Sequence, residues 1–394
     1  MSAAHFRPAP AVAIVAACRF PAPRGSQVLI DGMAAAYADA GIETHLVAPM
    51  AGSVARPYRT HAVSRRLALA PPADPVAWPR SARLLFDAAL AMRLLAVVRR
   101  EKIAVVHAHN YEALVAALLV RAAVGTPVVF HAHAALADEL PLYASVPVAA
   151  SGGARRFGAW CDRALPRLAD RVVVLSEDVA NYLRTRGVAP ERLAVVPPAI
   201  DAAPFAGAER RSRARRAVFA GNLDPYQNLS LLLDAWADAS RRRGAAELRI
   251  VTHASGDRLA RAIARRRLGG AVRVVPAWTL PDVSRELAGG SVGISPRQSW
   301  SGFPIKTLNY MASALPTVAL AASAKGIRDG ETGWVVRDAT AAGLGAALHA
   351  ALDDDAACAR RGRAAREVVR DCHSWQRVAP ALLEVSRQAA DAPA

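Results

Sequence analysis

Cysteine is scarce in this sequence, and its spacing excludes two common uses of the residue. The four cysteines, Cys18, Cys161, Cys358 and Cys372, are scattered, and no two of them form a Cys-x-x-Cys pair. Neither a disulfide framework nor a cysteine-based zinc site is therefore indicated. This pattern fits a reducing compartment, and we expect a cytoplasmic protein.

Long uncharged hydrophobic runs are also missing. Residues 84–98 are interrupted by Asp87 and Arg93, and residues 113–124 by Arg121. Neither run reaches the roughly 18–20 residues that a membrane-spanning helix requires. Residues 1–10 contain no basic segment followed by a long apolar stretch, so no export signal is predicted. The chain should be soluble or should bind a membrane only peripherally.

Lysine is nearly absent from a chain that is nevertheless strongly basic. Only three of its 50 basic residues are lysines, while the net charge is +17 and the pI is near 10.9. Biased genomic composition explains an excess of arginine and alanine without any partner. The alternative is an anionic membrane surface, contacted at the inner face of the cytoplasmic membrane through the arginine-rich residues 58–100. No nucleic acid is expected, because no aromatic-rich basic stripe or known nucleic-acid motif is present.

Apolar segments dominate what is present, and their arrangement predicts the fold class. The 394 residues are 53% hydrophobic, which is enough for two cores. Short apolar runs alternate with helical patterns, stop at residues 195–204, and then resume. The expected strands are residues 12–17, 43–48, 104–109, 127–131, 171–175, 217–220, 248–252, 272–275, 292–294, 317–319 and 334–336.

Strands that alternate with helices at this spacing predict an α/β fold with two doubly wound parallel-sheet domains. We place these domains at residues 1–200 and 201–375, followed by a C-terminal helix at 376–394. Ligands of such sheets bind beyond the carboxyl ends of the strands. The cleft between the two domains is therefore the expected site.

Three segments carry residues suited to chemistry. The turn at residues 24–27 places Gly25 and Ser26 before a helix expected at residues 28–40, where backbone N–H groups either bind a phosphate or only shape the turn. His107, His109, His131 and His133 end two strands; they suit metal ligation or, as we prefer, separate core and cleft roles. Residues 295–312 place Arg297 and Lys306 near the start of one helix. This arrangement suits binding of a pyrophosphate, and the alternative is an exposed basic loop without a ligand.

The order of these pieces resembles the retaining glycosyltransferases of the GT-B fold, specifically glycosyltransferase family 4. The resemblance spans about 330 residues, and its segments share the family's order. The matching segments are residues 18–30, 105–113, 127–141, 172–201, 218–236, 295–312 and 330–336.

The resemblance implies transfer of a sugar from a nucleotide-diphosphate donor to a hydroxyl of a carbohydrate or lipid-linked acceptor, with retention of anomeric configuration. It implies no cofactor and no metal, with a role in surface polysaccharide or glycolipid synthesis. The catalytic residues would be His133, Lys306 and Arg297, and His109 and Glu139 would lie on the acceptor side. The residues implied for donor binding are Gly25, Ser26, Gly221, Asn222, Gln227, Ser301, Gly302, Phe303 and Asn309.

The chain departs from the family pattern at four of these positions. The family usually has two glutamates where this chain has Ser301 and Asn309, and an arginine and a lysine where it has Asn222 and Gln227. Arg297 and Lys306 would replace the lost positive charge. The departures leave two alternatives open, which are a non-catalytic binding or scaffold relative and a sugar-nucleotide epimerase.

Overall fold

The N-terminal half of the computed structural model folds around a seven-stranded, fully parallel sheet. The structure describes residues 11–18, 20–21, 24–49, 56–63, 80–142, 150–206, 215–242, 246–254 and 256–392. The strand order is β3-β2-β1-β4-β5-β6-β7. The strands are β1 (Val12–Ala16), β2 (Thr44–Ala48), β3 (Arg59–Ala62), β4 (Val105–His109), β5 (Val128–Ala132), β6 (Arg171–Val174) and β7 (Leu193–Val195).

Helices cover both faces of this sheet, which is why its central strands are apolar throughout. Every residue of β1, β2, β4 and β5 is buried. The helices of this half are α1 (Gly25–Asp39), α2 (Arg80–Arg100), α3 (Asn110–Val124), α4 (Leu136–Glu139), α5 (Ser151–Ala164) and α6 (Glu177–Arg184). Apolar side chains of α2, α3 and α6 form the core on one face, and those of α1 form the core on the other.

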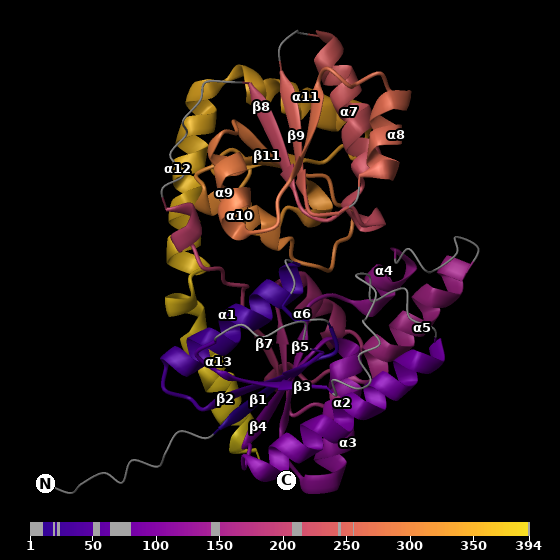
Figure 1. Cartoon of the computed structure of the whole chain (residues 1–394), viewed down its shortest axis with the longest axis vertical. Coiled ribbons are helices and arrows are strands. Elements are labelled where there is room, and N and C mark those ends of the chain that lie inside the picture. The colour runs from indigo at the N-terminus through magenta and orange to yellow at the C-terminus, as the bar shows by residue number, and fades with distance from the viewer. Residues whose placement is uncertain are drawn as a thin grey trace, which may run out of the picture.

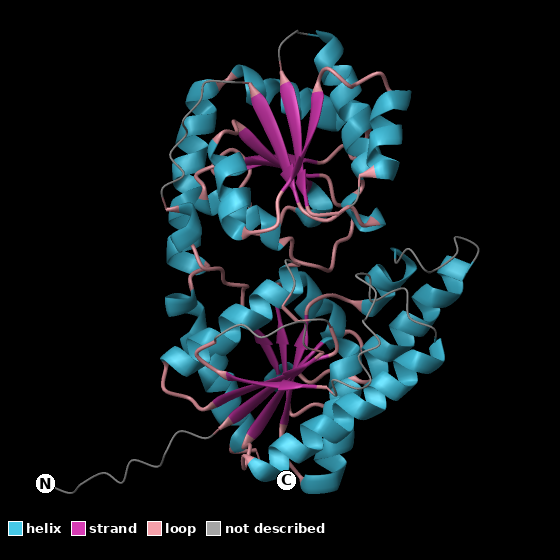
Figure 2. Ribbon diagram, in the orientation of Figure 1, coloured by secondary structure: helices cyan, strands magenta, loops and turns pink. Residues whose placement is uncertain are grey.

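The C-terminal half repeats this plan with six parallel strands in the order β10-β9-β8-β11-β12-β13. The strands are β8 (Arg216–Ala220), β9 (Glu247–Thr252), β10 (Val272–Pro276), β11 (Val292–Ser295), β12 (Thr317–Leu320) and β13 (Gly333–Val336). The helices are α7 (Leu229–Arg242), α8 (Asp257–Arg265), α9 (Leu280–Ala288), α10 (Ile305–Ala312), α11 (Ala341–Asp353) and α12 (Asp355–Cys372). Figure 1 shows the two domains one above the other, and Figure 2 shows the strands of each sheet surrounded by helices.

The last helix, α13 (Trp375–Ala390), returns to the N-terminal domain. It follows α12 along one side of the molecule (yellow in Figure 1) and packs against α1 and the strands β4 to β6. The hydroxyl of Ser386 lies 3.0 Å from that of Tyr37. Gly32 in α1 faces the indole of Trp375 so closely that a Cβ would overlap the ring. The two domains are therefore joined twice, near residue 200 and through α12 and α13.

The predicted fold class is confirmed, because both halves are doubly wound parallel sheets. The strands β3 and β7 at the edges of the first sheet were not predicted, since each is too short to show a clear pattern. Helix α1 begins at Gly25, earlier than the expected start at residue 28. No helix in the described part of the chain is both long and apolar enough to cross a bilayer.

Candidate functional site

A cavity of about 430 Å³ lies between the two domains, and the carboxyl ends of both sheets surround it. Residues that directly follow strands make up much of its wall. They are Ala17 after β1, Asn110 after β4, His133 after β5, Gly221 after β8, His253 after β9 and Ala277 after β10. The cavity thus occupies the place where doubly wound sheets bind their ligands.

Two helices begin at this cavity. Gly25 and Ser26 form the first turn of α1, and Ile305 and Lys306 form that of α10. The two ends lie close together, since a Cβ on Gly25 would come within 3.2 Å of Ile305 Cγ1. Backbone N–H groups in a first helical turn lack partners within the helix and give this region a positive potential. The wall is therefore suited to an anion.

Lys306 is the most unusual charged residue of the cavity. Its ammonium donates a hydrogen bond to the side-chain oxygen of Gln227 and lies 4.0 Å from the centroid of the Phe219 ring. No carboxylate within the described residues forms an ion pair with it. Burial holds the pKa of Lys306 well below its usual range, and the positive charge of Arg297 lowers it further. An anion that entered the cavity would remove this penalty.

Arg297 joins the two domains. Its Nη2 donates hydrogen bonds to Glu139 Oε1 at 2.6 Å and to Ser299 Oγ at 2.9 Å, and its guanidinium lies 5.0 Å from the centroid of the Tyr226 ring. The ion pair of Arg297 and Glu139 requires glycine at position 302, because a Cβ there would overlap the guanidinium. Glu139, which we expected on the acceptor side, lines the cavity while it holds Arg297.

Ser301 does not line the cavity, contrary to the expectation that it contacts the donor. Its backbone N–H and its hydroxyl both donate to Asp138 Oδ2, at 3.0 and 2.8 Å. The same oxygen accepts a hydrogen bond from Ser299 Oγ at 2.7 Å. A glutamate at position 301 would face Asp138 and be repelled by it. Asp138, which the sequence analysis missed, therefore gives a physical reason for serine at this position.

Two amide side chains connect Lys306 to a carboxylate further along the cavity wall. Gln227 Nε2 donates to Asn222 Oδ1 at 2.8 Å, and Asn222 Nδ2 donates to Asp224 Oδ2 at 2.7 Å. Asp224 in turn lies 3.5 Å from Nη1 of Arg24, in the N-terminal domain. The two departures at positions 222 and 227 thus belong to one network that crosses the cavity. Gly221, Phe303 and Asn309 complete the predicted donor residues that line it.

Four histidines form a column that runs from the buried core to the cavity; we call His107, His109, His131 and His133 the histidine column. His133 lines the cavity, and its Nε2 lies 2.8 Å from Nδ1 of His109. The ring of His109 stacks on that of His131, with centroids 4.2 Å apart. Nε2 of His131 lies 2.9 Å from Nδ1 of His107, and the other ring nitrogen of His107, Nε2, lies 3.0 Å from Ser386 Oγ.

This column corrects one expectation about the strand ends. His109 was expected on the acceptor side of the cleft, but it is fully buried behind His133 and does not line the cavity. His131 and His133 divide as we preferred, with one ring in the core and one at the cleft. His107 pairs with His131 and His109 with His133 through ring nitrogens, while Nε2 of His109 is buried without a hydrogen bond.

The histidine column predicts a loss of stability in mild acid. Burial lowers the pKa of His107 to about 3 and that of His133 to about 4, and it lowers the pKa values of His109 and His131 well below 6.5. The unfolded chain, with histidine pKa values near 6.5, therefore binds more protons than the folded chain as the pH falls from about 7 toward 4. The urea midpoint should decrease between pH 7 and pH 5, where most carboxylates remain ionised. A constant midpoint over this range would contradict the buried, neutral state of these rings.

The structure adds residues that the sequence analysis did not select. Trp278, in the loop after β10, is 68% exposed and lines the cavity, with its ring centroid 6.2 Å from that of His253. Arg24, Tyr226 and Glu112 also line the cavity. A tryptophan two residues after a parallel strand was a signal in the sequence, since ligands of such sheets bind beyond the carboxyl ends of their strands.

Comparisons with known proteins agree with this geometry. Residues 23–203 match the family model described as Glycosyltransferase Family 4, and residues 214–354 match the one described as Glycosyl transferases group 1. The chain is 27% identical over 391 residues to the D-inositol 3-phosphate glycosyltransferase of Pseudarthrobacter chlorophenolicus, with 93% of this chain and 91% of that protein covered.

Two solved structures share the fold over nearly the whole chain. Sucrose-phosphate synthase from Thermosynechococcus elongatus superposes with a TM-score of 0.81 at 17% identity, covering 96% of this chain and 98% of that one. HepE of Anabaena in complex with UDP-glucose gives a TM-score of 0.70 at 14% identity, covering 95% and 98%. The matches of both domains show that the chain belongs to the glycosyltransferases of family 4, and the two structural likenesses show that it has their GT-B fold.

Proposed function

We propose that this enzyme transfers a sugar from a nucleoside-diphosphate sugar to a hydroxyl acceptor with retention of anomeric configuration. The observation that carries the proposal is the half-buried ammonium of Lys306, without a carboxylate partner in the described part of the chain, at a helix N-terminus in the interdomain cavity. A diphosphate supplies the negative charge that this position lacks. The similar fold of HepE, solved with UDP-glucose, supports a donor of this class.

The positive groups of the cavity suit the chemistry of the leaving group. Negative charge develops on the diphosphate as the glycosidic bond breaks, and preorganised positive groups stabilise that charge. Lys306, Arg297 and the first turns of α1 and α10 are held in place before the donor binds. We therefore propose that transfer needs no metal ion and no cofactor, with the nucleotide sugar acting as substrate.

Trp278 should form a stacking surface for the nucleotide base. Its exposed ring lies at the end of the cavity formed by the loops after β9 and β10. Stacking of a base on an aromatic side chain contributes about 1–3 kcal/mol. We expect Trp278→Ala to weaken binding of UDP and of other nucleoside diphosphates by this amount, measured by calorimetric titration. Phe157→Ala, which removes an exposed aromatic ring outside the cavity, is the control and should leave affinity unchanged.

Incubation with a panel of nucleotide sugars tests the proposed function. The expected result is release of a nucleoside diphosphate together with a glycosylated acceptor, or slow donor hydrolysis without an acceptor, and its loss in Lys306→Met. Nucleotide binding without any turnover on the panel would favour a non-catalytic binding subunit. A product that remains a nucleotide sugar with changed configuration would favour an epimerase instead.

We further propose that the acceptor belongs to surface polysaccharide or glycolipid synthesis and that the enzyme works at an anionic membrane surface from the cytoplasm. Helix α5 carries exposed Phe157 and Trp160, 57% and 61% accessible, beside exposed Arg155, Arg156 and Arg163. Apolar rings flanked by arginines suit the interface of an anionic leaflet. In the region predicted from sequence, Leu85 is exposed, Phe86 packs against the core, and residues 64–79 lie outside the described residues.

Binding to vesicles checks the membrane proposal. The protein should sediment with vesicles of anionic lipid at low salt, less at high salt, and much less after Phe157→Ser and Trp160→Ser. Trp278→Ala, which removes an exposed ring in the other domain, should not change sedimentation. Failure to sediment at low ionic strength would leave the basic composition as the explanation of the charge.

A further inference from the structure

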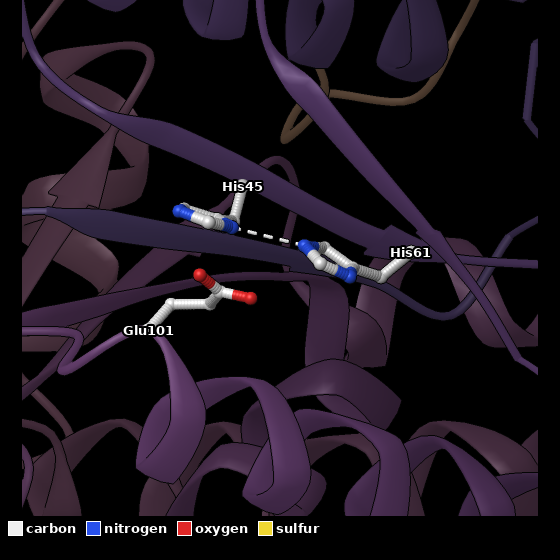
Figure 3. Close-up of side chains that lie close together, drawn as sticks. All are labelled: His45, His61 and Glu101. Carbon is white, nitrogen blue, oxygen red and sulfur yellow. Dashed lines mark hydrogen bonds between the residues drawn. The ribbon is translucent and has the colours of Figure 1, made fainter.

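A second cluster of chemically active side chains lies at the outer edge of the N-terminal sheet. It comprises His45 on β2, His61 on the edge strand β3 and Glu101 directly after α2, and Figure 3 shows the three side chains pointing toward one another. The register of the strands explains the meeting of the two imidazoles. His61 lies opposite Val47, two residues beyond His45, so both rings point to the same face of the sheet. None of the three lines the interdomain cavity.

The donor atoms of these side chains converge in a largely buried place. Nδ1 of His45 lies 2.9 Å from Nε2 of His61, and one ligand atom from each of the three residues lies within 4.8 Å of the others. The two histidines are 0% and 6% exposed, and the Glu101 side chain is 13% exposed. A hydrogen bond between two ring nitrogens requires one of them to accept, so at least one ring is neutral. Neutral imidazole is the form that binds metal ions.

The other ring nitrogen of His45 lies near a carboxylate that can orient the ring for metal binding. Its Nε2 is buried without a hydrogen bond, and Oε1 of Glu43 lies 3.4 Å away. A histidine that ligates through one nitrogen commonly presents the other, as N–H, to a carboxylate. Glu43 is therefore placed to orient His45.

We propose that His45, His61 and Glu101 bind a divalent transition-metal ion, with Zn²⁺ as the best match to two imidazoles and one carboxylate. Tetrahedral ligands at about 2.0–2.2 Å from zinc lie about 3.3 Å from one another, so the imidazoles need to separate only slightly. Glu101 needs to move inward, and water would fill the fourth position. The ion would fasten the edge strand β3 to β2 and to the end of α2. Its role is structural and independent of sugar transfer.

Two arginines compete with the ion for Glu101. Nη1 of Arg59 lies 3.3 Å from Oε2, and Nε of Arg100 lies 2.6 Å from Oε1. Both side chains are exposed, at 64% and 69%, so each can turn into solvent when a cation takes the carboxylate. The two carboxylates, Glu43 and Glu101, then face a doubly charged ion at the site.

The test uses the full chain, stripped of metal with a chelator and titrated with Zn²⁺ against a chromophoric competitor. We expect one equivalent to bind and to raise the melting temperature. Glu101→Gln and His61→Gln should each weaken binding by at least about tenfold, because loss even of groups that only orient a ligand costs 10–100-fold. The controls are the variants His349→Ala and Cys372→Ser, which change other candidate zinc ligands. A further control is the parent chain without added zinc.

Co²⁺ distinguishes this site from adventitious thiol binding, since its visible spectrum differs between nitrogen–oxygen and sulfur ligands. Absence of a bound equivalent, or equal affinity in Glu101→Gln and the parent chain, would overturn the proposal. Glu101→Gln keeps the arginine contacts within reach and changes no buried histidine, so it remains informative if His61→Gln does not fold. Loss of zinc binding in Cys372→Ser alone would assign the ion to the exposed cysteine instead.

Discussion

Replacement of Lys306 by methionine should weaken the binding of UDP or another accepted nucleoside diphosphate by about 1.5–3 kcal/mol, which is the usual value of a hydrogen bond to a charged group. The ammonium lies between Gln227 and Phe219 at the start of α10, and methionine fills much the same space. The fold should therefore survive while the positive charge is lost. Calorimetric titration of UDP, GDP and ADP against both proteins measures the change.

Lys325 provides a matched control for this variant. It is also a lysine at the domain boundary, but it forms an ion pair with Asp178 and does not line the cavity. Lys325→Met should leave nucleotide affinity unchanged. Equal affinity of Lys306→Met and the parent protein would remove Lys306 from the donor site.

The same residue predicts a proton linkage. Burial and Arg297 hold the pKa of Lys306 well below its usual range in the free protein, and a bound diphosphate would raise it again. Binding therefore takes up a proton at any pH between the two values, and affinity decreases as the pH rises through that window. Titrations in two buffers of different ionisation enthalpy should show greater proton uptake for the parent protein than for Lys306→Met.

The fold was predictable because both sheets are covered on two faces. Their central strands must then be continuously apolar, and the runs at residues 12–17, 104–109 and 127–131 correspond closely to β1, β4 and β5. Edge strands have no such signature. Only one of the four residues of β3 is buried, and β7 is three residues long. The return of α13 to the first domain depends on contacts more than 270 residues apart in sequence, such as that of His107 with Ser386.

The residues of the candidate site could be predicted where they lie close together in one segment of the sequence. They could not be predicted where the site depends on contacts between the domains. Arg297, Lys306 and Gly302 lie close together in one segment, and all three line the cavity. Asp138 was missed because its partners, Ser299 and Ser301, lie about 160 residues away. The burial of His109 could not be predicted either. Alternation along β4 does not show that His133, from the neighbouring strand end, lies between His109 and the cavity.

Replacement of His133 should have the largest effect on turnover. The imidazole forms part of the cavity wall in the N-terminal domain, whereas Lys306 and Arg297, which we propose bind the diphosphate, line it from the C-terminal domain, and the imidazole is held by His109. Loss of a preorganised polar group that acts mainly in the transition state lowers kcat by about 10²–10³. His133→Ala should show this loss while its affinity for the nucleoside diphosphate stays nearly unchanged. Steady-state kinetics and calorimetry with the accepted donor measure the two effects separately.

The pH profile distinguishes this role from that of a titrating base. Burial lowers the pKa of His133 to about 4, so the ring is neutral from about pH 5 upward. Titration of His133 should therefore cause no inflection near pH 6.5 in the rate of the parent enzyme. The pH profiles of the parent enzyme and His133→Asn should have the same shape around this pH. His133→Asn retains a polar side chain in the wall, and it should recover part of the activity lost in His133→Ala if the ring contributes a hydrogen bond. Equal losses of turnover and of nucleotide affinity, together with a lowered melting temperature in both variants, would instead identify His133 as the structural end of the histidine column.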